Sequence, residues 1–308
     1  MRVLVAGATG VIGRQLVPVL QGAGHTVIGL SRTAPAGPVG HETVAVDALD
    51  PTALRLAVKA AEPDAVVHLL TAIPKELNPR RIAADFALTN RLRTEATRSL
   101  IEAATEVGAK RFIAQGLAFA YRPGDGLADE DTPLWTDGPA SYRPLIEALI
   151  ELERLTAEVD GTVLRFGQLY GPGTVFAPDG SFTAAIRAGK MPLIGRGTSV
   201  FSFLHTRDAA TAITAALDKP VSGAFNVVDD TPVPFAEWLP EVVKQLVAPR
   251  PKKVPAWLVR PVVGSYGVAF MTRLRGVSNV RARLELDWRP GYPSWRQGFA
   301  AELWGRVG

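Results

Sequence analysis

A glycine-rich turn near the start of the chain is the feature that most constrains its fold. The turn follows the apolar run at residues 3–5 and precedes apolar residues at helical spacing, among them Leu16 and Leu20. Its members are Gly7, Ala8, Thr9, Gly10, Val11, Ile12 and Gly13. Glycines let the backbone approach a pyrophosphate, and the free amides and positive dipole end of the next helix attract its charge. The sequence therefore predicts a strand, a phosphate-binding turn and a helix, in preference to a turn without a ligand.

Strands and helices alternate over residues 1–170, which predicts an α/β fold with a doubly wound parallel sheet. The expected strands cover residues 2–6, 25–30, 43–46, 64–70, 111–115 and 162–166. A long amphipathic helix is expected over residues 80–107, an irregular acidic loop over 116–139 and a further helix over 140–159.

The last third of the chain changes character, with short helices and strands that indicate a smaller C-terminal α/β lobe. We expect a Rossmann-type domain over residues 1–170, to which residues 205–228 return, and a substrate-binding lobe over residues 171–308. No low-complexity linker separates the two parts, so the substrate cleft is expected between them.

Composition excludes several classes of protein and site. The chain has 308 residues, of which 47% are apolar and 21% are charged, as in ordinary globular proteins. It has no cysteine, so disulfides, thiolate nucleophiles and zinc ribbons are excluded and a cytoplasmic location is expected. Neither a secretory signal nor a charge-free run long enough for a membrane span is apparent, so no membrane contact is expected.

The distribution of charge and the spacing of the histidines bear on which ligands and metals the chain could bind. Residues 250–308 hold 11 Lys or Arg against 3 Asp or Glu, but no nucleic-acid-binding module accompanies this basic segment. Attraction of an anionic cofactor or substrate is therefore preferred to nucleic-acid binding. The four histidines are dispersed without metal-ligand spacing, so no metal site is expected.

The end of the second expected strand bears on the choice of cofactor. A nucleotide-binding fold that selects NAD usually places Asp or Glu there to accept hydrogen bonds from the ribose 2′-hydroxyl, whereas this chain has Ser31 and Arg32. A hydroxyl and a guanidinium suit a 2′-phosphate. NADP(H) is therefore favoured, NAD(H) stays possible, and the alternative for Arg32 is a solvated loop charge.

Residues at the carboxyl ends of the other strands are expected beside the cofactor, because ligands of open parallel sheets bind at that edge. They are Asp47, Ala48, Leu69, Leu70, Thr71, Ala72, Gln115, Phe166 and Gly167. Asn90, on the long helix, is expected to face the same crevice, with a polar surface residue as its alternative. His68 lies inside an apolar strand and is expected to be a core histidine.

Several segments together resemble the extended short-chain dehydrogenase/reductase superfamily, in the branch of nucleotide-sugar epimerases, dehydratases and related reductases. The resemblance covers nearly the whole chain and rests on residues 7–13, 64–69, 163–173, 203–210, 278–283 and 288–290. It implies a nicotinamide cofactor, and it also implies a homodimer built from the helices around residues 88–107 and 140–159.

The acid–base set that the resemblance implies is incomplete here. Members of the superfamily use a tyrosine, a lysine four residues later, and a serine or threonine at the end of the fifth strand. Tyr142 occupies the tyrosine position, but Ile146 replaces the lysine, and counting back from Tyr121 places Leu117 at the hydroxyl position. Without the lysine, the pKa of the Tyr142 phenol is expected to stay near its ordinary value of about 10.

Tyr142 is nevertheless the first catalytic candidate, with an ordinary amphipathic tyrosine as its alternative, and Gln115 and Tyr121 are weaker candidates. The expected substrate-contacting residues are Ile73, Gln168, Tyr170 and Phe201. The leading hypothesis is an atypical NADP(H)-dependent reductase acting on a small, fairly apolar carbonyl or alcohol. The alternatives are an NADP(H)-sensing or scaffold protein without turnover, and a non-redox isomerase or lyase on the same fold.

Overall fold

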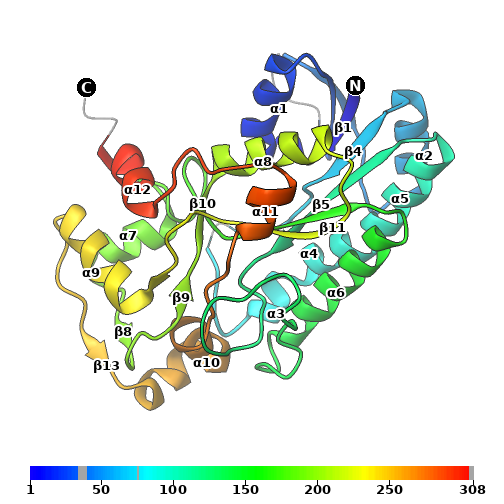
Figure 1. Ribbon diagram of the computed structural model, residues 1–308. Helices are drawn as coiled ribbons and strands as arrows, with labels where there is room; N and C mark the ends of the chain where they lie inside the picture. The colour runs from blue at the N-terminus through cyan, green and yellow to red at the C-terminus, as the bar shows by residue number, and fades with distance from the viewer. Residues whose placement is uncertain (34–39, 75, 305–308) are drawn as a thin grey trace.

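Seven parallel strands form the centre of the structure, a computed structural model that describes residues 1–33, 40–74 and 76–304 (Figure 1). The strands are β1 (Arg2–Ala6), β2 (Thr26–Ser31), β3 (Glu42–Ala45), β4 (Ala65–His68), β5 (Arg111–Leu117), β6 (Thr162–Phe166) and β11 (Gly223–Val227). Their order in the sheet is β11-β6-β5-β4-β1-β2-β3. The predicted α/β fold with a doubly wound sheet is confirmed.

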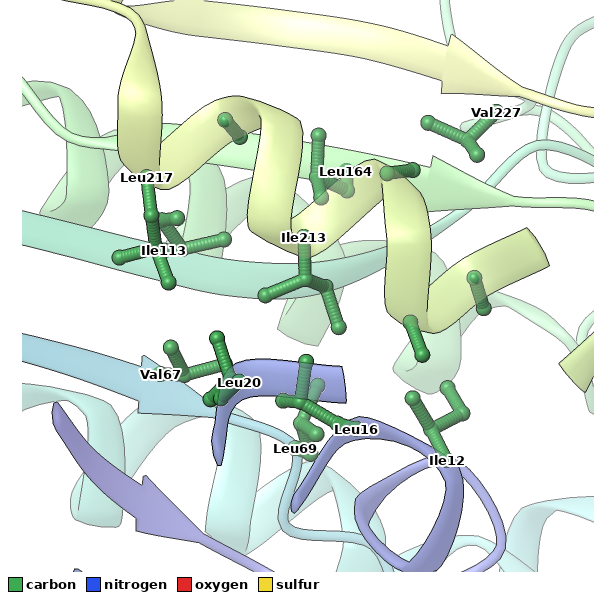
Figure 2. Close-up of a cluster of buried hydrophobic side chains, with 14 of the residues drawn as sticks. Ile12, Leu16, Leu20, Val67, Leu69, Ile113, Leu164, Ile213, Leu217 and Val227 are labelled. Atoms are coloured by element: carbon green, nitrogen blue, oxygen red, sulfur yellow. The ribbon is translucent and has the colours of Figure 1, made fainter. Parts of the chain in front are cut away.

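Helices cover both faces of this sheet. The helices α1 (Gly13–Gly22) and α8 (Thr206–Asp218) pack on one face, and α2 (Pro51–Ala61), α5 (Thr97–Glu106) and α6 (Arg143–Ala157) pack on the other. Figure 2 shows side chains of α1 and α8 meeting those of the strands in the first of these cores: Leu16, Leu20, Ile213, Leu217, Val67, Ile113 and Leu164. The strands are buried on both faces, which explains their nearly continuous apolar sequences.

The strand order reverses beside β1, which has β2 on one side and β4 on the other. Parallel sheets of this kind bind ligands in the crevice beyond the carboxyl ends of the strands at such a reversal. The predicted glycine turn, residues 7–13, joins β1 to α1 at this position, and its last residue, Gly13, is the first residue of α1.

The long helix expected over residues 80–107 is divided in the structure. It consists of α3 (Ile82–Asp85), α4 (Ala87–Arg91), a π-helical turn η1 (Leu92–Ala96) and α5. The π turn inserts one extra residue per turn and leaves carbonyls that need other partners. The hydroxyl of Thr97 donates to the carbonyl of Arg93 over 2.7 Å, which satisfies one of them.

The second lobe is built from three short strand pairs and a group of helices. The pairs join β7 (Gln168–Tyr170) to β10 (Phe203–His205), β9 (Val200–Phe201) to β12 (Val233–Pro234), and β8 (Leu193–Ile194) to β13 (Lys253–Val254). The helices are α7 (Ser181–Arg187), α9 (Phe235–Gln245), α10 (Ala256–Thr272), α11 (Val280–Glu285) and α12 (Trp295–Trp304). Within β7, Tyr170 belongs to the aromatic core of this lobe, whereas Leu169 packs against the core under α8. The exact domain boundaries stay a prediction.

A buried carboxylate lies where the chain leaves β11. Asp229 is 1% exposed, and one of its oxygens accepts a hydrogen bond from the amide of Thr231 over 3.1 Å. The other oxygen has no partner among the described residues. Burial, with a smaller contribution from Asp230 and Asp208, raises the pKa of Asp229 to about 7.

This carboxyl makes stability depend on pH. Between pH 4 and 7 the unfolded chain ionises Asp229 while the folded chain keeps the proton, so the residue increasingly destabilises the fold as pH rises. We expect Asp229→Asn to increase the free energy of unfolding at pH 8 by on the order of 3 kcal/mol, and the increase to vanish near pH 4. Urea unfolding at both pH values measures this. The control, Asp125→Asn on the exposed loop, is expected to change stability equally little at both, and the prediction is wrong if the two variants behave alike.

Candidate functional site

The turn between β1 and α1 has a backbone that only glycine permits at two positions. Gly7 has φ of 97°, in the left-handed region. A Cβ on Gly13 would lie 2.3 Å from the carbonyl oxygen of Gly7 and 2.5 Å from that of Ala8. The amide of Gly10 donates to the Gly7 carbonyl over 3.0 Å, which closes the turn. The residues therefore form a tight backbone cradle against the start of α1.

The cradle presents unused hydrogen-bond donors. Among the described residues, the backbone amides of Val11 and Ile12 have no acceptor, and no side chain caps the start of α1. The first turn of α1 carries no acidic residue that would repel an anion. Free amides at a helix N-terminus are suited to a phosphate, so this turn fits the diphosphate of a dinucleotide.

The residues expected at the other end of the cofactor lie beyond β2 and β3. The Ser31 hydroxyl donates to the carbonyl of Thr33, while Arg32 is exposed and makes no hydrogen bond or ion pair with the described residues. Asp47 is exposed, and its carboxylate accepts a hydrogen bond from the Leu49 amide over 3.0 Å. Ala48 beside it is buried. The unpaired guanidinium is therefore free to meet an anionic group at this edge.

The segment after β4, expected beside the cofactor, follows the carboxyl end of that strand. Leu69 is buried, Leu70 and Ala72 are partly buried, and Thr71 is exposed. The amide of Ala72 donates to the hydroxyl of Thr89 in α4 over 3.0 Å, which fixes the segment against that helix. Further along, Ile73 is 41% exposed and is available to a ligand.

The last residue of β4 holds the π turn in place. His68 accepts a hydrogen bond from the Leu70 amide at Nδ1 over 3.3 Å, so Nε2 carries the proton toward the Thr97 hydroxyl at 3.0 Å. The carbonyl of Leu92 lies 3.3 Å from Nε2. Burial lowers the pKa of His68 to about 4, with a small further effect of the Arg93 charge, so the ring is neutral at pH 7. As expected, this is a core histidine with a structural role.

Two polar side chains near this turn have unsatisfied buried atoms. Asn90 is partly buried, and its side-chain oxygen has no partner among the described residues. Arg93, one helical turn later, is only 2% exposed, and its Nη1 atom also lacks a partner. Its guanidinium lies 5.9 Å from the ring centre of Phe86. The sequence named Asn90 as a candidate but not Arg93, although an arginine on the apolar stripe of an amphipathic helix was a usable signal.

Tyr142 lies beside Arg93 but is poorly suited to proton transfer. Its hydroxyl donates to the carbonyl of Phe119 over 3.2 Å, and its ring packs 5.0 Å from that of Tyr266. Burial raises the pKa of Tyr142 well above its ordinary value, and the Arg93 charge opposes this only in part. The expectation of an ordinary pKa was therefore wrong, because the ring is 1% exposed. The two other positions of the acid–base set, Leu117 and Ile146, are buried and apolar.

Tyr121 belongs to a structural network rather than to the crevice. Its hydroxyl donates to the Asn226 side chain and accepts from Arg165, each over 2.6 Å. Arg165 in turn forms a bidentate ion pair with Glu153 at 2.7 and 2.8 Å. Burial raises the pKa of Tyr121 to about 12. The expected catalytic role of Tyr121 is therefore corrected, because its hydroxyl is fully engaged within the core.

Two expected substrate contacts are corrected as well. Tyr170 is 1% exposed and stacks on Phe299 at 4.7 Å, and Phe201 is fully buried 5.8 Å from the ring of Phe203. Both serve the aromatic core of the second lobe. The reason is that β7 pairs with β10 and β9 pairs with β12 within that lobe, which the local sequence did not reveal.

Three further candidates at the junction of β6 and β7 are held by packing. Phe166 is buried in the core under α8. A Cβ on Gly167 would lie 2.2 Å from the Ser202 carbonyl oxygen, so this glycine permits β7 and β10 to approach. The Gln168 side-chain oxygen accepts from the Ser202 amide over 3.0 Å.

Gln115 is partly buried on β5 without a hydrogen-bond partner among the described residues and stays a candidate.

Other kinds of site find little support in the described parts of the chain. Residues 1–33, 40–74 and 76–304 contain no group of three or more His, Asp or Glu placed to hold a metal ion. Over the same residues, every helix is too short or too polar to cross a bilayer.

Comparisons with known proteins indicate the family to which the chain belongs. Residues 3–228 match the family model described as the NAD dependent epimerase/dehydratase family. The chain is 46% identical to a 3-diazoavenalumate denitrifying reductase from Streptomyces sp, over 98% of this chain and the full length of that protein. It is 29% identical to the 2′-dehydrokanamycin reductase of Streptomyces kanamyceticus, over 83% of this chain and 70% of that protein.

Solved structures are similar in fold. The human epimerase family protein SDR39U1 (isoform 2), solved with NADPH, superimposes with a TM-score of 0.75 at 24% identity, over 98% of this chain and 99% of that chain. The protein MoeE5, solved with UDP-glucose and NAD, gives a TM-score of 0.75 at 25% identity, over 98% of this chain and 97% of that chain. A nicotinamide cofactor is thus supported for the fold, without a distinction between NAD and NADP.

Proposed function

Because the chain belongs to the NAD-dependent epimerase/dehydratase family, we propose that it is an NADP(H)-dependent reductase that removes the nitrogen of an aromatic diazo compound. One observation carries the proposal. The backbone cradle for a dinucleotide is intact, whereas Leu117 and Ile146 are apolar and the Tyr142 hydroxyl is bonded to a carbonyl. The site therefore suits a reduction that needs a positioned hydride donor and no proton donor.

The chemistry of diazo reduction meets this condition. Reduction of a carbonyl generates an alkoxide, which an enzyme must stabilise or protonate. When bound, the nicotinamide supplies a hydride, and with an arenediazonium ion the C–N bond breaks, a C–H bond forms and nitrogen leaves as N₂ with the bonding pair. No proton is taken up in this exchange. The name of the relative at 46% identity describes a reductase that denitrifies a diazo compound, which favours this substrate class over a carbonyl.

The protein's own groups then have limited tasks. The amides of Val11 and Ile12 would hold the diphosphate, and the unsatisfied side-chain oxygen of Asn90 would accept a hydrogen bond from the bound cofactor or substrate. The buried apolar residues Leu117 and Ile146 offer no proton donor at the two positions, and they would help to exclude water from the reacting carbon. The rate enhancement would then come from the positioning of the nicotinamide against the substrate and from the exclusion of water.

Preference for NADP(H) over NAD(H) is part of the proposal and rests on Ser31 and Arg32. We expect Arg32→Ala to raise the Kd for NADPH about 10-fold, because a guanidinium–phosphate contact contributes roughly 1.5 kcal/mol. The Kd for NADH is expected to change by less than about twofold, since NADH lacks the 2′-phosphate. Titration of both nucleotides by calorimetry measures this, and an equal effect on both would contradict the assignment.

Turnover assays test the reaction itself. We expect 4-carboxybenzenediazonium to consume NADPH and release one N₂ for each NADPH, above the rate of a protein-free mixture, while a panel of aldehydes and ketones is inert. Tyr142→Phe is expected to retain the diazo activity within about twofold, because the phenol donates no proton. Carbonyl turnover without diazo turnover would favour the carbonyl reductase instead. NADPH binding without turnover of either class would indicate a sensor or scaffold, and product without loss of NADPH an isomerase or lyase.

A homodimer and a cytoplasmic location stay predictions. The helices α4 and α6, which the dimer would use, expose the apolar side chains Leu88 and Ile150 to 38% and 41%. Light scattering of the purified chain gives the mass in solution and decides between a monomer and a dimer.

A further inference from the structure

Arg93 is a buried cation for which the described residues provide no counter-charge. Its side chain takes part in no ion pair or hydrogen bond with the described residues, and its Nη1 atom is both solvent-inaccessible and unpartnered. Burial lowers the pKa of Arg93 to about 10, so the guanidinium is still charged at neutral pH. An uncompensated buried charge destabilises a fold by several kcal/mol. The unpartnered Nη1 donor therefore leaves a hydrogen-bonding position open to an acceptor that is not among the described residues.

The position of Arg93 places that acceptor in the candidate site. The π turn carries Arg93 one turn after Asn90 and fixes its backbone through Thr97 and His68, which ends β4. The Arg93 charge acts electrostatically on both His68 and Tyr142. Arg93 thus lies between the carboxyl end of β4 and the position that the family uses for its tyrosine.

The side chains around Arg93 are flat and apolar. Phe86 lies under the guanidinium, and the rings of Tyr142, Trp135 and Tyr266 continue this surface, with Trp135 at 6.2 Å and Tyr266 at 5.0 Å from Tyr142. Tyr266 comes from α10, a helix of the second lobe that Gly264 interrupts with φ of 71°. Aromatic walls beside a single unpaired cation suit a flat, anionic ligand.

The phosphates of the cofactor are assigned elsewhere. The diphosphate fits the amides at the start of α1, and Arg32 lies at the far side of β1, beyond β2. We infer that Arg93 binds an anionic oxygen of the substrate, a carboxylate or a phenolate, and thereby selects anionic aromatic diazo compounds. This inference rests on the proposed function for the reacting group, but the anion site is defined by Arg93 itself.

Binding of an inert pair of ligands tests the anion site without turnover. Benzoate and benzamide have the same shape and differ in charge. In the presence of saturating NADPH, we expect calorimetry to detect benzoate with the wild-type protein and at least 10-fold weaker binding of benzamide. Arg93→Met is expected to weaken benzoate about 30-fold and leave benzamide unchanged. The matched control is Arg91→Met. Arg91 lies two residues before Arg93, is exposed and pairs with Glu95.

Kinetics with three diazo compounds identify the bound oxygen. We expect Arg93→Met to raise KM about 30-fold for one of the two anionic compounds, 4-carboxybenzenediazonium or 4-hydroxybenzenediazonium. For benzenediazonium, which lacks the anionic group, KM is expected to rise less than twofold. The kcat is expected to stay within about twofold of the wild-type value for all three compounds. A response of the first compound assigns a carboxylate, and a response of the second assigns a phenolate. Arg93→Lys keeps the charge and is expected to recover part of the loss.

A structural role for Arg93 predicts a different pattern. It predicts a lower Tm for Arg93→Met with unchanged discrimination between benzoate and benzamide, whereas removal of an unpaired charge is expected to leave Tm equal or higher. Equal binding of the two ligands by the wild type, or equal effects of Arg93→Met and Arg91→Met, would overturn the anion site. Selective benzoate binding without diazo turnover would overturn the proposed reaction and leave the anion site intact.

Discussion

Replacement of Gly13 by alanine is expected to raise the Kd for NADPH at least about 100-fold. The new Cβ would lie 2.3 to 2.6 Å from backbone atoms of Gly7 and Ala8, so the turn between β1 and α1 has to move. Displacements of about 1 Å in a positioning element commonly change function by two orders of magnitude. The amides of Val11 and Ile12 move with the turn, and the diphosphate loses its donors. Calorimetric titration with NADPH measures the loss.

The matched control is Gly22→Ala at the end of the same helix. A Cβ on Gly22 meets no atom within 4 Å. Alanine is the better helix former, so this variant is expected to bind NADPH as the wild type does, with equal or slightly higher stability. If Gly13→Ala binds NADPH as tightly as Gly22→Ala, the dinucleotide does not rest on this turn.

The second large effect is expected for stability, at Arg165. Arg165 joins Glu153, the Tyr121 hydroxyl and the carbonyl of Glu130 within the core, and its side chain is 7% exposed. Methionine keeps the volume of the aliphatic part but leaves these acceptors without a donor. We expect Arg165→Met to lower the free energy of unfolding by about 3–5 kcal/mol in urea denaturation at pH 7.

An exposed arginine provides the comparison. Arg154 pairs with Glu151 and Glu158 on the outer face of α6, with 49% of its side chain exposed. Arg154→Met is expected to change the free energy of unfolding by less than about 1 kcal/mol, because exposed pairs contribute little. Similar losses at the two positions would mean that the Tyr121 network does not stabilise the core, and a catalytic role for Tyr121 would need to be considered again.

The parts of the fold that were predicted correctly have local causes. The apolar strand before Gly7 and the helical spacing after Gly13 lie within about twenty residues, and steric limits on the glycines fix the turn between them. The candidate cofactor residues at the ends of β2, β3 and β4 followed from the rule for parallel sheets, and the strands end where the sequence predicted within a few residues.

The errors arise where partners are far apart in the sequence. Tyr121 bonds to Asn226, 105 residues away, and no local pattern reveals that its hydroxyl is already engaged. Tyr170 and Phe201 resemble cleft residues until their short strands pair within the second lobe. The helical repeat around Arg93 was interpreted as apolar, so this residue was not named from the sequence. The π turn that buries Arg93 is held by His68, which lies on β4 and is distant in the sequence.

Both the sequence and the structure show that the acid–base set is incomplete. Replacement of the lysine and the hydroxyl by Ile146 and Leu117 was evident from the sequence. The structure adds that the remaining Tyr142 is buried and bonded to the Phe119 carbonyl, so it does not compensate. A reaction that releases N₂ needs no proton donor. The reductase activity that we propose is therefore compatible with the incomplete acid–base set.

Isotope transfer tests that central claim most directly. The chain is incubated with 4-carboxybenzenediazonium and NADPH that carries two deuterium atoms at the nicotinamide C4 position, and the benzoate formed is analysed by mass spectrometry and NMR. We predict one deuterium at the ring carbon that carried the diazo group, with one N₂ released for each NADPH oxidised. Benzoate that contains hydrogen from the solvent at this carbon, or no benzoate above the protein-free rate, would contradict the account.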